Sequence, residues 1–349
     1  MQKLNIDSLS LSGHKFYGPK GVGALYVKTG VPFEKFISGG HQERNKRAGT
    51  ENVTGIVGIG KAIELAYENL DEHNKKIKEL SNNIKMPAIG FGTYKSGNED
   101  ETAEIVSYAL KVGYRQIDTA SFYGNEIGIG KGIKNSGIDR EEIFIVTKIW
   151  NYDHGYENTI KACNESLKKL QVEYLDLYLI HWPNELNAET WRALEYLYQC
   201  GKVKAIGVCN FKIGHLEELK KTAQIMPMVN QIEIHPLSAK EEMLQYCQKN
   251  NIQLVAWSPI MRGRVFSNEL IIGLSEKYKK TIAQIILRWH VQRGVIPIPK
   301  SSNKERIKEN LNIFDFEISN EDMKIINSLN ESDSVSVSGV PDNTTYLKY

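Results

Sequence analysis

Four polar residues end or follow three apolar, strand-like runs, and their types suit acid–base chemistry. They are Asp118, Tyr123, Lys148 and His181. A titratable side chain at the end of an apolar strand is costly to bury unless another group pairs with it. Because the carboxyl ends of parallel strands meet at one face of a barrel, we expect these side chains to form one reaction site.

The phenol of Tyr123 is the expected proton donor of this set. A phenol has an ordinary pKa of about 10, and an adjacent ammonium such as that of Lys148 should lower it. A carboxylate would fix the ammonium, and an imidazole opposite would hold a substrate oxygen. The set suits protonation of an oxygen that gains charge, as when hydride adds to a carbonyl. A cofactor is then required, since no side chain supplies hydride.

Short apolar runs that alternate with amphipathic stretches must position these groups. The alternation predicts βαβ units, and eight units in about 250 residues favour a closed (β/α)8 TIM barrel of the α/β class. An open doubly wound sheet is the alternative, weakened because no G-x-G-x-x-G follows the first run. The predicted strands are 88–93, 115–119, 143–148, 175–181, 204–209, 228–234, 252–257 and 295–299, and the helical patterns between them are 101–112, 156–170, 190–200, 212–222, 240–249 and 269–292.

The composition is ordinary and argues against several classes of partner. The chain has 349 residues, 25% of them charged, and a formal net charge of +2, which favours neither nucleic acid nor a membrane as partner. No apolar run approaches membrane-spanning length. None of the four cysteines lies in a C-x-x-C pair, so we expect no metal site and a reduced, cytoplasmic protein. The cysteines are Cys163, Cys200, Cys209 and Cys247.

Residues 84–330 resemble an aldo-keto reductase along their whole length. The matching stretches are MPAIGFGTY at 86–94, GYRQIDTA at 113–120, YGNE at 123–126, VTKIW at 146–150, YLDLYLIHWP at 174–183, GKVKAIGV at 201–208, NQIEIHP at 230–236 and IPKS at 298–301. The resemblance implies a barrel fold and NADPH-linked reduction of aldehydes or ketones to alcohols. It also implies that Tyr123 is the general acid, that Lys148 lowers its pKa, that Asp118 anchors Lys148, and that His181 orients the carbonyl.

The same resemblance implies a cofactor site for NADPH. Trp257 should stack on the nicotinamide, and Lys300 with Arg306 should hold the adenosine 2′-phosphate, which favours NADPH over NADH. The full set of expected cofactor contacts is Gly92, Thr93, Asn210, Gln231, Trp257, Ser258, Pro259, Lys300, Ser301, Arg306, Glu309 and Asn310. The expected lining of an aromatic substrate pocket is Tyr94, Trp150 and Trp182.

The sequence departs from the family pattern at several places. Cys209 stands where serine is usual, and a thiol is a weak donor for the nicotinamide carboxamide. The loop at 184–187 is short, which predicts a wide substrate mouth. Residues 80–85 leave little room for the strand pair that usually plugs the barrel base, so we expect that pair to be truncated. The tail at 332–338 only loosely resembles the closing loop that shapes substrate choice in the family.

The segment before the barrel resembles part of a cysteine desulfurase, an enzyme that uses pyridoxal phosphate. The matching stretches are SLSGHKFYGPKG at 10–21 and RAGTEN at 47–52, and a helical pattern from 53 to 80 follows them. By the resemblance Lys15 is the Schiff-base lysine, while Ser12, His14 and Thr50 would contact the cofactor phosphate.

We expect this segment to be vestigial, with no use of pyridoxal phosphate. Residues 1–80 contain no cysteine, and nothing before Met1 supplies the rest of such a site. The predicted division is a fragment at 1–80, drawn from a PLP-dependent transferase fold, and a barrel at 81–349.

Two readings other than a reductase remain open. One is a non-catalytic barrel that only binds the nucleotide, since fold does not fix function. The other is a residual pyridoxal-phosphate function of the first segment. A monomer that acts on a small carbonyl compound is expected, whereas the identity of that compound is not predicted.

Overall fold

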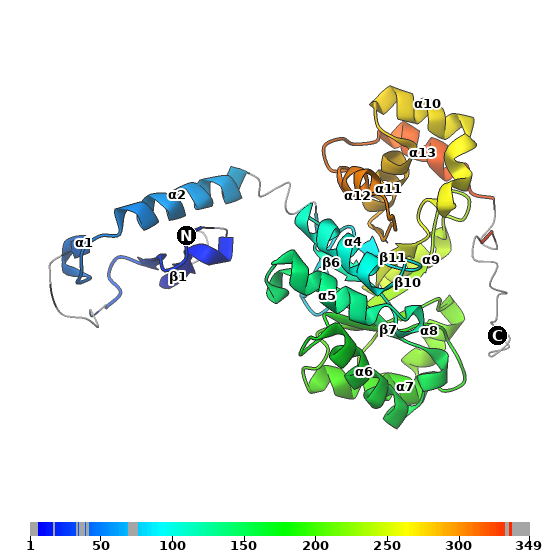
Figure 1. The fold of residues 1–349 in the computed structure, drawn as a ribbon, viewed down its shortest axis with the longest axis horizontal. Helices are drawn as coiled ribbons and strands as arrows, with labels where there is room; N and C mark the ends of the chain where they lie inside the picture. The colour runs from blue at the N-terminus through cyan, green and yellow to red at the C-terminus, as the bar shows by residue number, and fades with distance from the viewer. Residues whose placement is uncertain are drawn as a thin grey trace. The chain divides into compact units, whose positions relative to one another are not determined.

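A computed structural model of the chain describes residues 6–16, 18–32, 34, 39, 42–68, 76–331 and 335–336 (Figure 1). It divides into two compact units, Met1–Asn74 and Lys75–Tyr349. Each unit is described by itself. In the described part of the chain, no helix is both long and apolar enough to cross a membrane.

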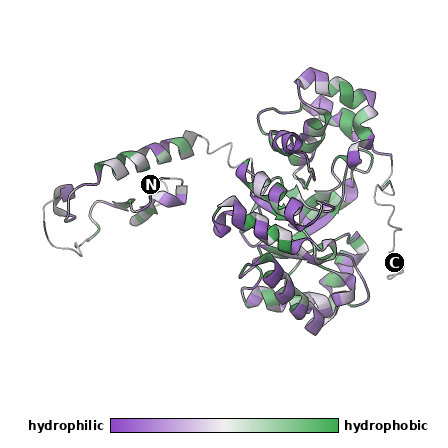
Figure 2. Ribbon diagram, in the orientation of Figure 1, coloured by the Kyte–Doolittle hydropathy of each residue, from purple (hydrophilic) through white to green (hydrophobic). Residues whose placement is uncertain are grey.

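The first unit is small and has little core. Strands β1 (Ser8–Ser12) and β2 (Gly23–Val27) pair antiparallel, and the short helix η2 (Gly13–Phe16) joins them. Helices α1 (Gln42–Asn45) and α2 (Val53–Glu68) follow. Figure 2 shows apolar segments along α2. Large apolar side chains of this unit that remain exposed are Leu25, Val53, Ile56, Val57, Ile63 and Leu65. Ile59 is the one large apolar side chain among its described residues that is buried.

The second unit is a closed barrel of eight parallel strands in chain order. The strands are β5 (Phe91–Gly92), β6 (Gln116–Asp118), β7 (Phe144–Ile149), β8 (Leu177–Ile180), β9 (Ile206–Cys209), β10 (Val229–Glu233), β11 (Gln253–Trp257) and β12 (Ile296–Pro297). Backbone hydrogen bonds at 3.0 Å close the ring, from Gly90 N to Pro297 O and from Gly92 N to Pro299 O. The predicted barrel is therefore confirmed.

Amphipathic helices surround the strands, and their buried faces complete the core (Figure 1). They are α4 (Glu99–Lys111), α5 (Glu126–Ser136), α6 (Tyr156–Leu170), α7 (Asn187–Gln199), α8 (Ile213–Lys220), α9 (Glu241–Lys249), α10 (Glu269–Tyr278), α11 (Ile282–Gln292), α12 (Lys304–Leu311) and α13 (Asn320–Asn327). Among the described residues of this unit, the loops hold the 3-10 helices η3 (Ser121–Tyr123), η4 (Arg140–Glu142), η5 (Asn151–Asp153) and η6 (Met261–Ser267).

The single helix predicted at 269–292 is wrong, because two local signals break it. Lys279 has a left-handed φ of 53°, which ends α10. The Thr281 hydroxyl accepts from Gln284 N, and the Gln284 side chain accepts from Thr281 N. This reciprocal capping box starts α11 as a separate helix.

The predicted truncation of the base strand pair is also wrong. Strands β3 (Ile77–Glu79) and β4 (Lys85–Pro87) form an antiparallel hairpin with three residue pairs. Residues 77–79 were predicted as the end of a helix, but alternate burial and a turn at Asn83, whose φ is 65°, favour a strand pair. Leu80 and Met86 anchor the hairpin in the core.

The predicted closing tail at 332–338 lies outside the described residues except for Val335 and Ser336. Val335 packs against the barrel core, and the Ser336 hydroxyl donates to Glu233 Oε2 at 2.5 Å. Because Glu233 ends β10, this bond ties the tail to the carboxyl-end face of the barrel.

Candidate active site

The structure brings the four predicted catalytic residues together at the carboxyl ends of neighbouring strands. Asp118 ends β6, Lys148 is the penultimate residue of β7, and His181 directly follows β8. Tyr123 ends η3, the one-turn helix after β6. The register pairs β6 with β7 and β7 with β8, so adjacent strands deliver these side chains to one face.

Lys148 is a fully buried cation held by two acceptors. Its Nζ donates to Asp118 Oδ1 at 2.5 Å and to the Thr119 carbonyl at 2.8 Å. The other Asp118 oxygen, Oδ2, accepts from Gln231 Nε2 at 2.7 Å. Burial opposes the charge, but Asp118 outweighs it with help from Tyr123, so the pKa of Lys148 is raised above its ordinary value. The ammonium is therefore charged at neutral pH.

Tyr123 lies beside this ammonium, with the Lys148 Nζ 5.2 Å from its ring centroid. Lys148 lowers the phenol pKa as predicted, but burial is the larger effect and raises the pKa of Tyr123 to about 12. The expectation of a net lowered pKa is thus wrong for this arrangement of groups. The consequence is a phenol that keeps its proton at neutral pH and can donate it.

His181 is a neutral imidazole that faces the phenol. Its ring centroid lies 5.7 Å from that of Tyr123 and 5.2 Å from that of Trp150. Burial, followed by the charges of Lys148 and His154, lowers the pKa of His181 well below its ordinary value. Its Nδ1 is buried and has no hydrogen-bond partner among the described residues. A neutral ring can donate one hydrogen bond to a substrate oxygen.

Three aromatic side chains stand around the phenol and the imidazole. The Tyr94 ring lies 4.9 Å from Tyr123, and the Phe122 ring stacks on Trp150 at 4.0 Å. Tyr94 and Phe122 are 41% and 52% exposed, so they form an accessible apolar wall. Sequence reasoning did not single out Phe122, although its place in η3 beside Tyr123 was a usable signal. Trp182 directly follows His181 and is half-buried. In the described part of the chain its ring does not stack on the rings of Tyr94, Phe122 or Trp150.

The residues predicted to hold the nicotinamide lie next to the four catalytic candidates. The Asn210 side chain donates to the His181 carbonyl at 3.0 Å and accepts from Trp257 Nε1 at 2.9 Å. Gln231 is the register partner of Cys209, and both are buried. Burial raises the pKa of the Cys209 thiol, so this group is protonated and only a weak donor. The Gln231 amide nitrogen uses one of its two N–H groups to donate to Asp118 Oδ2, so its other N–H and its oxygen are the groups that a ligand could use.

The segment after β11 has a strained backbone conformation, which suits a close approach of a ligand to the main chain. Ser258, Met261 and Arg262 have left-handed φ values of 49°, 49° and 52°. The Pro259 carbonyl lies 3.3 Å from His290 Nε2 of α11. Left-handed backbone at non-glycine residues costs free energy and tends to cluster at functional sites.

Gly92 lies at the seam that closes the barrel, and Thr93 directly after it bonds to the neighbouring strand β6. A Cβ at Gly92 would lie 2.8 Å from the Ile298 carbonyl, so only glycine lets these backbones meet there. The Thr93 hydroxyl donates to the Asp118 carbonyl at 2.8 Å. This seam also brings the 298–300 segment against the strand that follows the base hairpin.

Of the residues predicted to bind the adenosine end, Lys300 and Ser301 precede α12 and Arg306 lies in its first turn, whereas Glu309 and Asn310 lie in its last turn. The Lys300 ammonium donates to Ser302 at 2.8 Å, Ser301 is buried, and Arg306 is exposed in the first turn. Cations at a helix amino terminus suit a phosphate group. Glu309 accepts from the Thr281 hydroxyl at 2.7 Å, and Asn310 is buried beside it.

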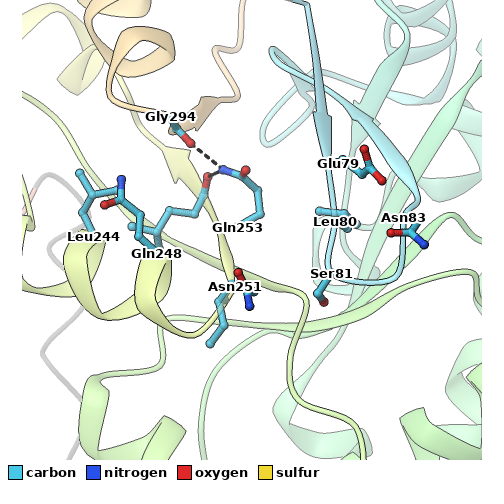
Figure 3. Close-up of a pocket in the computed structure, with 11 residues that line it drawn as sticks. Glu79, Leu80, Ser81, Asn83, Leu244, Gln248, Asn251, Gln253 and Gly294 are labelled. Atoms are coloured by element: carbon cyan, nitrogen blue, oxygen red, sulfur yellow. Dashed lines mark hydrogen bonds between the residues drawn. The ribbon is translucent and has the colours of Figure 1, made fainter. Parts of the chain in front are cut away.

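A polar cavity of about 490 Å³ lies at the opposite ends of the strands (Figure 3). Its walls come from the β3–β4 hairpin, α9 and the first residues of β11, including Glu79, Gln248 and Gln253. Gln253 begins β11 whereas Trp257 ends it, so this cavity is separate from the catalytic candidates.

Three of the residues predicted in the first unit, Ser12, His14 and Lys15, lie close together, and no described contact joins Thr50 to them. Lys15 lies in η2 with His14, whose Nδ1 is 3.0 Å from the Ser12 hydroxyl. No group of three His, Cys, Asp or Glu side chains that could hold a metal occurs among the residues described in either unit.

Comparisons with known proteins match both parts of the chain to families. The model of the Aldo/keto reductase family matches residues 88–331, and the model of the class-V aminotransferases matches residues 1–135. A glyoxal reductase of Bacillus subtilis is 53% identical over 262 residues, which is 75% of this chain and 95% of that protein. The 9,11-endoperoxide prostaglandin H2 reductase of Trypanosoma cruzi is 46% identical over 76% of this chain and 94% of its own length.

Solved structures match the barrel as well. An aldo/keto reductase from Brucella melitensis has a TM-score of 0.70 and 46% identity, over 73% of this chain and 99% of that one. A Bombyx mori aldo-keto reductase in complex with NADP has a TM-score of 0.73 and 35% identity, over 77% of this chain and 97% of that one.

Proposed function

Because this chain belongs to the aldo/keto reductase family of NADP-dependent oxidoreductases, we propose that it reduces small aldehydes and ketones to alcohols with NADPH. The single observation that supports this most strongly is the environment of Tyr123. A protonated phenol lies beside a buried ammonium and faces a neutral imidazole.

The residues fit NADPH on two observations of this structure. The amide oxygen of Gln231 and the ring of Trp257 lie beside the four catalytic candidates, and the cations Lys300 and Arg306 lie at the start of α12. Trp257 would hold the nicotinamide, and Lys300 with Arg306 would hold the 2′-phosphate. When bound, NADPH supplies the hydride.

The residues of the chain perform the other half of the reaction. His181 donates a hydrogen bond to the carbonyl oxygen and orients it towards Tyr123. As the oxygen gains charge, the Tyr123 hydroxyl transfers its proton to it, and the phenolate left behind is stabilised by the Lys148 ammonium. Asp118 and the Thr119 carbonyl keep that ammonium in place. After turnover, Tyr123 must regain its proton.

Replacement of Tyr123 by phenylalanine tests the acid assignment. Tyr123→Phe keeps the ring against Tyr94 but removes the proton, so turnover of a reactive aldehyde should fall by about 10²–10⁴-fold. NADPH binding, followed by fluorescence titration, should be retained. A variant that turns over at the wild-type rate would refute the assignment.

The apolar wall beside Tyr123 favours a particular class of substrate. Tyr94, Phe122 and Trp150 offer aromatic faces rather than charges, which suits small uncharged carbonyl compounds, and a relative named as a glyoxal reductase acts on such a compound. A panel of short aldehydes, dicarbonyls and ketones should show turnover with NADPH, and NADH should serve less well because it has no 2′-phosphate. Equal rates with both cofactors would contradict the proposed roles of Lys300 and Arg306.

For the segment at 1–80 we propose no catalytic role, and for the barrel at 81–349 we propose a monomeric, cytoplasmic enzyme. The exposed apolar side chains of α2 support a fragment that lacks the rest of its core. Mixing the full chain with pyridoxal phosphate should give no stable aldimine absorption. An absorption that disappears in Lys15→Ala would overturn this view.

A further inference from the structure

Asn125 follows the proposed proton donor closely in the sequence and takes no part in the steps above. It stands two residues after Tyr123 and is 7% exposed. Asparagine at a helix start usually caps the helix with its side chain. At the N-cap of α5, however, the Asn125 side chain makes no capping bond. Its amide is used elsewhere.

The amide oxygen of Asn125 bonds to Thr119, a residue that holds the buried Lys148 ammonium. Asn125 Oδ1 accepts from the Thr119 hydroxyl at 2.7 Å. The carbonyl of the same Thr119 accepts from Lys148 Nζ at 2.8 Å. A shift of Thr119 would therefore move one of the two acceptors that fix Lys148.

The amide nitrogen of Asn125 bonds to the loop at 93–96, which packs against the Tyr123 phenol through Tyr94. Asn125 Nδ2 donates to the Thr93 carbonyl at 2.9 Å and to the Ser96 hydroxyl at 3.1 Å. Thr93 and Ser96 flank Tyr94, whose ring lies 4.9 Å from that of Tyr123. The Asn125 amide thus links Thr119, which holds Lys148, to the loop that carries Tyr94 beside Tyr123.

We propose that Asn125 is a positioning residue for the reductase site, whose amide locks the Thr119 acceptor of Lys148 and the Tyr94 loop in a single arrangement around Tyr123. This inference rests on the proposed function. A buried amide with both donors and its acceptor engaged is a rigid junction, because any movement leaves a buried polar group unpaired.

The test compares two asparagine-to-alanine variants of the full chain. Asn82 is the matched control at the base of the barrel, where its amide donates to Lys204 O at 3.0 Å and to the Tyr198 hydroxyl at 3.4 Å and accepts from Ile84 N at 3.3 Å. Both variants should lose some thermal stability. Only Asn125→Ala should lower kcat, by about 10–100-fold, because small displacements of reacting groups are costly.

The cofactor readout separates positioning from general damage. Among the described hydrogen-bond partners of Asn125, the only predicted NADPH residue is Thr93, which it contacts through the backbone, so the Kd for NADPH should change little in Asn125→Ala. A folded Asn125→Ala variant with wild-type kcat, or an equal kcat loss in Asn82→Ala, would overturn the inference.

A double-mutant cycle tests the route through Thr119. Thr119→Val removes the hydrogen bond between Thr119 and Asn125. The double variant Thr119→Val with Asn125→Ala should therefore lose little more kcat than the worse of the two single variants. The effects of Thr119→Val and Asn82→Ala, in contrast, should be additive. Losses that multiply would overturn the route. Should Asn125→Ala not fold, Thr119→Val alone must lower kcat with NADPH affinity kept, and wild-type kcat there would overturn it. A wild-type chain that reduces no carbonyl would instead refute the proposed function.

Discussion

The buried Lys148 ammonium is needed for the proposed chemistry but costs folding free energy unless Asp118 pairs with it. A buried charge is tolerated only with its partner, and here the carboxylate and a backbone carbonyl both serve the ammonium. The pair keeps a positive charge beside Tyr123, where a phenolate must form.

Removing one member of this pair should be worse for stability than removing both. Lys148→Met leaves the Asp118 carboxylate buried without its cation, which should destabilise the fold by about 3–5 kcal/mol. Adding Asp118→Asn removes the uncompensated charge and should restore much of that loss. Urea unfolding measures the stabilities. Neither variant should recover carbonyl reduction, and a fully active double variant would contradict the role of the ammonium.

The directions of two pKa shifts predict the pH dependence of turnover. Burial holds the pKa of Tyr123 at about 12, and that of His181 lies well below its ordinary value. Between pH 6 and 9 the phenol therefore stays protonated and the imidazole stays neutral. A plot of kcat/KM for aldehyde reduction should be flat across this range. A clear break near pH 6.5 would show that His181 titrates as an ordinary histidine.

At the scale of the element, local capping decides where helices end. The Thr281 hydroxyl accepts from Gln284 N and donates to Glu309 of α12, so one side chain starts α11 and links it to the next helix.

Loss of this cap should be measurable as a modest loss of stability. Thr281→Ala removes both bonds and should cost about 1 kcal/mol. Thr281→Ser keeps the hydroxyl and is the matched control. Chemical unfolding of the two variants gives the comparison, and equal stabilities would show that the cap contributes nothing.

The elements also show what could be predicted from sequence. The strand periods and the motifs placed Asp118, Lys148 and His181 at neighbouring strand ends, because parallel strands force their carboxyl ends together. The break at Lys279 and the strand at 77–79 were missed, since charged residues fit a helix surface and an edge strand equally well. The net pKa of Tyr123 was also missed. It depends on how much neighbouring protein covers the ring, which spacing along the chain does not encode.

At the scale of the whole molecule, the two compact units differ in how much apolar surface they bury. The barrel has an extensive core, whereas α2 exposes Val53, Ile56 and Val57.

Deletion of residues 1–74 should leave the enzyme intact. Every residue proposed for catalysis or NADPH binding lies in the second unit. We expect the shortened chain to keep the kcat, the KM and the cooperative melt of the full chain, and to be the less prone to aggregate because it lacks the exposed side chains of α2. Activity assays with light scattering measure both. Loss of turnover in a folded shortened chain would assign a role to the first segment.

The seam at Gly90 and Gly92 has a consequence for synthesis. It joins the start of the barrel to Pro297 and Pro299, more than two hundred positions later. A nascent chain on the ribosome holds all four reacting groups once His181 has emerged, yet the ring that encloses them waits for the last strand. Premature termination between His181 and the last strand would release a polypeptide that carries all four proposed catalytic side chains but has an open barrel and an incomplete site for NADPH.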